Sequence, residues 1–209
     1  MAGADLQRDL PEAQIHNSLL QGVLDRGLEQ AVPGLRSGHA VRYHLVQVPF
    51  GTGLEGPKAM KQLRVEAEGA TSAPPEVVWS LLADANRYPQ WGPWNDGGYE
   101  PSSQGPSQEG SVQWFRFGRR TKSVEKILEV DEPRRLVYTV LRGIPVRNYR
   151  AEVTLTPTSP AVGTSVRWTA TWDKTFMGRM VHRRLEQIYP LIVSALVAEA
   201  DRDEAANPR

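Results

Sequence analysis

Arg87-Tyr88-Pro89-Gln90-Trp91-Gly92-Pro93-Trp94 is the stretch that decides the fold. It ends a short helical pair that follows a single strand-like segment, and it precedes a series of further strands and one long helix. The whole pattern runs from Leu63 to Asp201. A twisted antiparallel sheet closed by a single helix leaves a hollow between the two layers, so this pattern favours the binding of an apolar small molecule.

Composition limits the function classes. The 209 residues include six Trp and are 40% hydrophobic, which is enough for a real core. A net charge of +1 favours neither a nucleic-acid surface nor an acidic lipid surface as partner. The absence of Cys excludes disulfides, thiolate nucleophiles and Cys-ligated metal centres.

The histidines give no sign of a metal or of a catalytic triad. His16, His39 and His44 precede the main pattern and His182 lies on the final helix, without metal-ligand spacing or a nearby carboxylate partner. We therefore expect no metal and no cofactor. No apolar run reaches the roughly 18 residues of a spanning helix, and no signal peptide is recognisable, so we expect no membrane span and a cytoplasmic protein.

Residues 1–59 differ from the rest of the chain. Residues 11–31 carry a helical apolar stripe weakened by two glycines, and residues 51–57 resemble a linker. We expect either a loosely structured extension or a start assigned too early, with Met60 as the natural first residue; the competing interpretation is a helix docked on the domain. The main domain is expected at 60–203, followed by a disordered tail at 204–209.

Alternating apolar residues predict a series of strands, and the short breaks between those after the helical pair permit hairpins rather than parallel crossovers. The expected spans are Leu63–Ala70, Gly97–Pro101, Ser111–Phe117, Lys122–Asp131, Arg135–Arg142, Val146–Thr156 and Thr164–Trp172. A final helix is expected at Phe176–Ala200, with Met177 and Val181 beginning its apolar stripe and a kink before Pro190.

Four segments together resemble one known superfamily. They are Ala73-Pro74-Pro75-Glu76-Val77-Val78-Trp79, the Arg87–Trp94 stretch, Val130-Asp131-Glu132-Pro133-Arg134-Arg135-Leu136-Val137-Tyr138 and Gly163-Thr164-Ser165-Val166-Arg167-Trp168. Their order and spacing are similar to those of the START/Bet v 1-like (SRPBCC) superfamily, in particular its bacterial polyketide cyclase/dehydrase members. The resemblance implies an α+β helix-grip fold, in which a curved antiparallel sheet wraps around a long C-terminal helix. It implies no single activity, because this fold hosts many.

Several aromatic residues are candidates for a ligand site. Trp91 and Trp94 either cover the mouth of the cavity or plug the edge of the sheet. In the last strand, Trp168 and Trp172 share a face that we expect to look toward the helix, where they either touch a ligand or fill space. Met177 and Val181 of the helix stripe complete this apolar set.

Polar candidates come from the middle strands. We expect Trp114 to point inward, because Gln113 suits solvent; Arg116 then also points inward and needs a carboxylate or phenolate partner, unless it reaches water at the strand end. Tyr138 and Tyr149 lie on strands with apolar alternation, and a buried phenol needs a hydrogen-bond partner, from a ligand or from the protein.

Two functions follow from this set. The first is binding of a hydrophobic small molecule (a lipid, a polyketide-like compound or an aromatic compound) in the cavity. The alternative is an aromatase/cyclase-type enzyme using Arg116, Tyr138 and Tyr149 for proton transfer, although the sequence shows no convincing base. Convergence of polar side chains in one cavity would favour the enzyme, and a cavity filled by side chains would favour a role in protein–protein contact alone.

Overall fold

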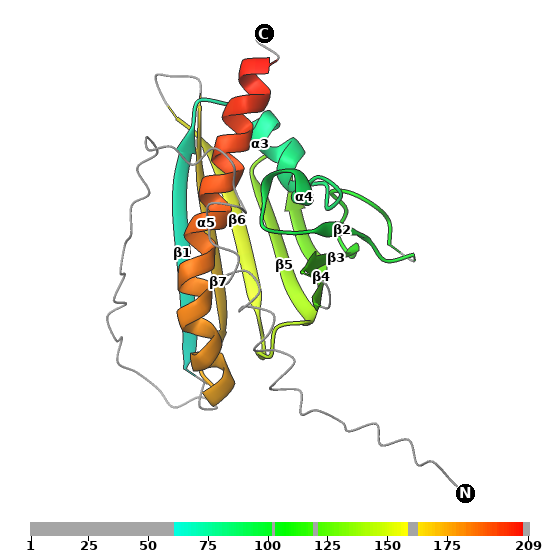
Figure 1. The fold of residues 1–209 in the computed structure, drawn as a ribbon, viewed down its shortest axis with the longest axis vertical. Helices are drawn as coiled ribbons and strands as arrows, with labels where there is room; N and C mark the ends of the chain where they lie inside the picture. Colours follow the sequence, from blue (N-terminus) through cyan, green and yellow to red (C-terminus); the bar gives the residue numbers. More distant parts are fainter. Residues whose placement is uncertain (1–60, 102, 119–120, 159–162, 207–209) are drawn as a thin grey trace, which may run out of the picture.

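The computed structural model describes residues 61–101, 103–118, 121–158 and 163–206, so the expectations about residues 1–59 and Met60 lie outside the described part (Figure 1). Its helices are α3 (Pro75–Leu82), α4 (Tyr88–Trp91) and α5 (Phe176–Ala206). Its strands are β1 (Gln62–Thr71), β2 (Asp96–Tyr99), β3 (Val112–Phe117), β4 (Thr121–Asp131), β5 (Arg135–Arg142), β6 (Arg150–Pro157) and β7 (Thr164–Asp173).

These strands form one antiparallel sheet of order β1-β7-β6-β5-β4-β3-β2. Consecutive strands from β2 to β7 are neighbours, and β1 joins the far edge by pairing with β7 from Gln62↔Asp173 to Thr71↔Thr164. The helix α5 lies along one face beside β1 and β7 (Figure 1). The predicted antiparallel meander and α+β helix-grip fold are confirmed.

Two boundaries differ most from the sequence expectation. Strand β6 begins at Arg150 rather than Val146, because the chain bends before it and Asn148 has a left-handed φ of 53°. Helix α5 continues through Pro190 to Ala206, so residues 204–206 are helical and the expected tail began too early. The last turns of α5 are held by Arg87, which donates a 2.8 Å hydrogen bond to Asp203.

The sheet bends most where β4 meets β5. Register shifts occur there between Val124 and Glu125 and again between Ile127 and Glu129. An extra residue in one strand bends that strand and increases its local twist. The middle of the sheet can therefore curve toward the side that carries α5.

The second half of helix α5 is held close to the C-terminal end of β1. A Cβ atom on Gly69 would lie 2.8 Å from Val193 Cγ1, so only glycine allows this approach without a shift of the helix side chain. Two turns further on, Asp201 Oδ1 accepts hydrogen bonds from Thr71 Oγ1 at 2.6 Å and from Ser72 N and Oγ at 2.9 and 2.8 Å. These contacts fix the helix against the end of β1.

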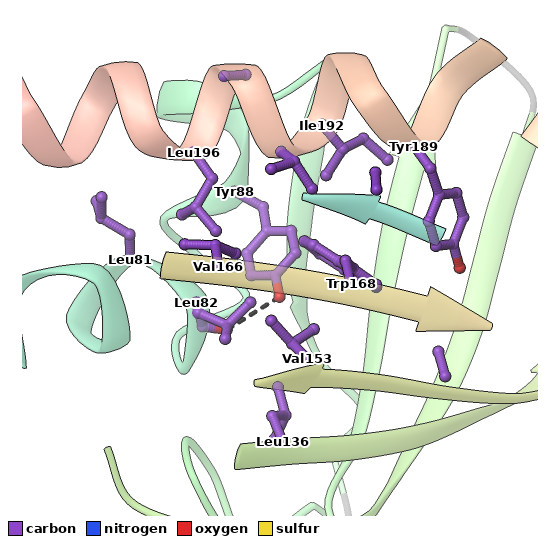
Figure 2. Packing of buried hydrophobic residues seen from close by; sticks show 14 of the residues in the cluster. Leu81, Leu82, Tyr88, Leu136, Val153, Val166, Trp168, Tyr189, Ile192 and Leu196 are labelled. Carbon is purple, nitrogen blue, oxygen red and sulfur yellow. Dashed lines mark hydrogen bonds between the residues drawn. The ribbon is translucent and has the colours of Figure 1, made fainter. Parts of the chain in front are cut away.

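The predicted inner face of β7 is confirmed. Val166, Trp168, Ala170 and Trp172 are each buried to within 3% exposure and belong to the core. Figure 2 shows Ile192 and Leu196 of α5 reaching toward the face of the sheet that carries Val166 and Trp168. The core is therefore one layer of side chains between α5 and the sheet.

We predict that Asp201→Ala lowers the free energy of unfolding by about 1–3 kcal/mol, because Thr71 and Ser72 lose their shared acceptor. Urea unfolding measures the change. Glu204→Ala, one turn later on the same helix, is the control and should cost less than about 0.5 kcal/mol. Equal costs in the two variants would show that Asp201 does not anchor α5.

Candidate functional site

A cavity lies between α5 and the curved middle of the sheet. Space of about 90 Å³ is open to water-sized molecules, whereas one water molecule needs roughly 10–15 Å³. Side chains therefore do not fill it. Its wall consists of Tyr88, Trp94, Phe115, Phe117, Ser123, Glu125, Tyr138, Gly143, Ile144, Pro145, Tyr149, Trp168, Val181, Leu185, Ile188, Tyr189 and Ile192.

Strand β3 presents the opposite face from the one predicted. Phe115 and Phe117 line the cavity and Gln113 is 2% exposed, whereas Trp114 lies on the outer face and Arg116 is exposed. Trp114 Nε1 donates to Tyr99 O at 3.3 Å. The expectation that Trp114 points inward was wrong, because the buried amide of Gln113 is accommodated inside beside Glu125 and two phenylalanines then face the core. Arg116 reaches water, which was the alternative given for it.

The α4 turn supplies one aromatic wall. Trp94 lines the cavity and packs against Phe115 and Phe117, with ring centroids 5.6 and 5.8 Å apart. Trp91 lies outside the wall, is 3% exposed and donates through Nε1 to Leu81 O at 3.3 Å. The two tryptophans of this stretch therefore differ: Trp91 packs in the core, whereas Trp94 forms part of the cavity wall.

A group of tyrosines forms the opposite wall. Tyr149 and Tyr189 share a short hydrogen bond between their hydroxyl groups, and Tyr138 Oη accepts a 3.1 Å hydrogen bond from Trp168 Nε1. Burial raises the pKa of Tyr138, Tyr149 and Tyr189, and the nearby carboxyl of Glu125 adds to the rise. These phenols therefore stay protonated at neutral pH, and all three residues line the cavity. Figure 2 shows Tyr189 extending from α5 toward the sheet.

Glu125 is the acidic group of this cavity. It follows Ser123 on the inner face of β4, and burial raises its pKa to about 8. Gln113 Nε2 donates a long 3.5 Å hydrogen bond to Glu125 Oε2 and opposes the rise. Ser123 also opposes it, although its hydroxyl makes no hydrogen bond of normal geometry within the described chain. The carboxyl therefore carries a proton in most molecules near neutral pH.

The remaining candidates are divided between the wall and the packing behind it. Val181 lines the cavity, together with Leu185 one turn later. Trp172 lies behind Tyr149, stacked on it at a centroid distance of 6.1 Å. Met177, on the first turn of α5, is partly exposed and outside the wall. The cavity thus brings together Trp94, Tyr138, Tyr149, Trp168 and Val181 from the predicted set.

The described residues contain no group of His, Asp or Glu side chains that could hold a metal ion. None of the helices described is both long enough and apolar enough to cross a membrane.

The sequence profile of the family described as polyketide cyclase / dehydrase and lipid transport matches residues 62–201. The chain belongs to this family. No curated protein is significantly similar to it.

Solved structures with the same fold agree with this membership. The Zhui aromatase/cyclase from a Streptomyces species is 19% identical with a TM-score of 0.58, over 70% of this chain and 99% of its own. A START superfamily protein from Mycobacterium smegmatis is 16% identical with a TM-score of 0.55, over 66% and 97%. A protein from Thermobifida fusca is 26% identical with a TM-score of 0.55, over 69% and 95%.

In this family member, Glu125 is the polar residue that sequence reasoning missed. Its signal was the alternation of Ser123, Glu125 and Ile127 on β4, since an inward Ile127 requires Glu125 to point inward too. Tyr189 was missed for a different reason. It lies beside the predicted apolar stripe of α5, and only the curved sheet brings Tyr149 within hydrogen-bonding distance of it.

We predict that Glu125 makes stability depend on pH. Its pKa is raised in the folded state from 4.5 to about 8, so the folded chain holds a proton that the unfolded chain releases. This contribution to stability is complete below about pH 4.5 and is lost as the pH rises through about 8. Above that, the buried charge costs on the order of a few kcal/mol.

Urea unfolding of the wild type and of Glu125→Gln, at about pH 5 and about pH 9, measures this effect. The wild type should lose more stability between the two pH values than the variant does. Glu76→Gln, which removes an exposed carboxyl on α3, should retain the wild-type dependence. A Glu125→Gln profile parallel to that of the wild type would contradict the prediction.

Proposed function

We propose that this protein binds an apolar small molecule in the cavity between α5 and the sheet. The observation that carries the proposal is an unfilled space walled mainly by aromatic and aliphatic side chains, into which the polar groups of Glu125 and three tyrosines converge. Ligand sites typically combine a large apolar wall with a few placed polar groups. The family description, which includes lipid transport, supports the same class of function.

A role in protein–protein contact alone has less support, because such a role was expected to leave the hollow filled by side chains. The cavity instead keeps about 90 Å³ open. Its wall also contains a buried polar atom, Ser123 Oγ, that lacks a hydrogen-bond partner within the described residues. A bound molecule can supply that partner and exclude water from the aromatic wall.

An enzymatic role is the second candidate, and Glu125 is the observation that favours it. A carboxyl with a pKa near 8 is matched to proton transfer at neutral pH, and the neighbouring phenols can hydrogen-bond a developing oxyanion. The aromatase/cyclase among the similar structures acts within the same fold. This candidate assigns the acid–base role to Glu125 rather than to the exposed Arg116.

The enzymatic candidate predicts exchange of an acidic carbon-bound hydrogen. With tetralone in deuterated buffer, the wild type should incorporate deuterium next to the carbonyl faster than Glu125→Gln, by roughly a hundredfold. Proton nuclear magnetic resonance measures the rate. Equal rates in both proteins would remove Glu125 from any proton-transfer role on such a ketone.

The binding proposal predicts that filling the cavity weakens ligand affinity. Val181→Phe adds volume to the wall of α5, whereas Met180→Phe places the same side chain at the preceding, half-exposed position. Isothermal titration calorimetry with naphthalenemethanol, a neutral apolar probe, should show saturable binding to the wild type and to Met180→Phe. Val181→Phe should bind it at least about tenfold more weakly.

Two outcomes would contradict the proposed cavity. Equal weakening by both phenylalanine variants would place the probe elsewhere or on the surface of α5. Equal affinity of the wild type and a folded Val181→Phe, with folding checked by near-ultraviolet circular dichroism, would show that this space does not hold the ligand.

A further inference from the structure

The cavity wall contains one acidic side chain and no basic side chain among the described residues. Glu125 is the ionisable carboxyl of the wall, and no Lys, Arg or His lines the cavity among the described residues. The groups that face Glu125 from the surrounding elements are neutral: Gln113 from β3, Ser123 from β4, Tyr88 from α4, Tyr138 from β5, Tyr189 from α5 and Tyr149 just before β6. No described side chain of the wall therefore supplies a counter-charge to this carboxyl.

The aromatic rings of the same wall favour a cation. Tyr88, Trp94, Phe115 and Trp168 line the cavity beside the tyrosine group. The faces of such rings carry negative partial charge and attract an ammonium group within about 6 Å. A carboxyl group and aromatic faces together form an environment that suits a positive nitrogen on an apolar body and repels an anion.

We propose that the ligand of this cavity is a hydrophobic amine, whose nitrogen is held by Glu125 while its apolar body packs against the aromatic wall. This inference rests on the proposed binding function and assigns it a ligand class. A neutral carbonyl compound can accept hydrogen bonds from the wall, but it gives the carboxylate form of Glu125 no counter-charge. An amine uses both the carboxyl and the rings.

Binding of an amine changes the protonation state of Glu125. Near neutral pH, Glu125 is mostly protonated in the empty cavity and the free amine is an ammonium ion. In the complex, the ammonium group pairs with the carboxylate form of Glu125, so the carboxyl loses its proton. Binding therefore releases about one proton per ligand near pH 7. The release falls toward zero above about pH 9, where Glu125 has already lost its proton.

The test compares naphthylmethylamine with naphthalenemethanol, which have the same ring system and nearly the same shape. Calorimetry near pH 7 in buffers of different ionisation enthalpy gives both affinity and proton release. The full-length wild type should bind the amine at least about tenfold more tightly than the alcohol and release about one proton with the amine only.

Glu125→Gln should abolish this preference. The variant should bind the alcohol within about threefold of the wild-type affinity and lose at least about tenfold in amine affinity, without proton release. Glu76→Gln, at an exposed position on α3, should behave as the wild type. Naphthoate, the anionic analogue, should bind more weakly than the alcohol to the wild type.

The outcomes separate the two proposals. If the alcohol binds the wild type as tightly as the amine, or if amine binding releases no proton, the amine assignment is overturned while the cavity keeps its binding function. If neither compound binds, both proposals fail. Tight amine binding that survives Glu125→Gln would also overturn the assignment, because the nitrogen would then be held elsewhere.

Discussion

The close contact between α5 and the end of β1 sets the geometry of the rest. Gly69 allows Val193 to approach the strand, and Asp201 ties the helix to Thr71 and Ser72. A helix that is fixed against one edge of a curved sheet need not stay in contact with the strands farther along the sheet. The cavity lies on that side, between the first half of α5 and the inner faces of β3, β4 and β5.

The cavity wall contains a carboxyl group, that of Glu125, whose burial lowers stability but raises its pKa into a range useful for proton transfer. Buried carboxyl groups normally have a cationic or hydrogen-bonding partner, because an uncompensated buried charge is costly. Burial raises the pKa of Glu125 to about 8, and Gln113 and Ser123 oppose this rise only in part. The tyrosines around it are satisfied by one another and by Trp168. The carboxyl is therefore the group of the wall whose state a ligand changes most.

The sequence predicted the inward face of a strand correctly where apolar residues occupy only every second position. In β7 the apolar residues fall on alternate positions only, so Trp168 and Trp172 had one possible face. In β3 both faces carry an aromatic side chain, and alternation alone cannot choose between Trp114 and Phe115. The choice depends on neighbours: Phe115 meets Tyr88 and Trp94, which come from a turn far away in the sequence. Glu125 escaped notice because a charged residue on a strand normally indicates a solvent-facing position.

The side chains that line the cavity from the strands are separate from those that fix α5 to the sheet. Gly69 and Asp201, which fix α5, do not line the cavity, whereas Phe115, Glu125 and Tyr138 line it from inward positions on β3, β4 and β5. Each inward position can change side chain without loss of the strand pairing that holds its backbone, because the ladder hydrogen bonds come from the main chain. Glu125 pairs with Val140 beside a register shift, where the strand already bends. A substitution at this position would alter the charge of the cavity while leaving the attachment of the helix intact.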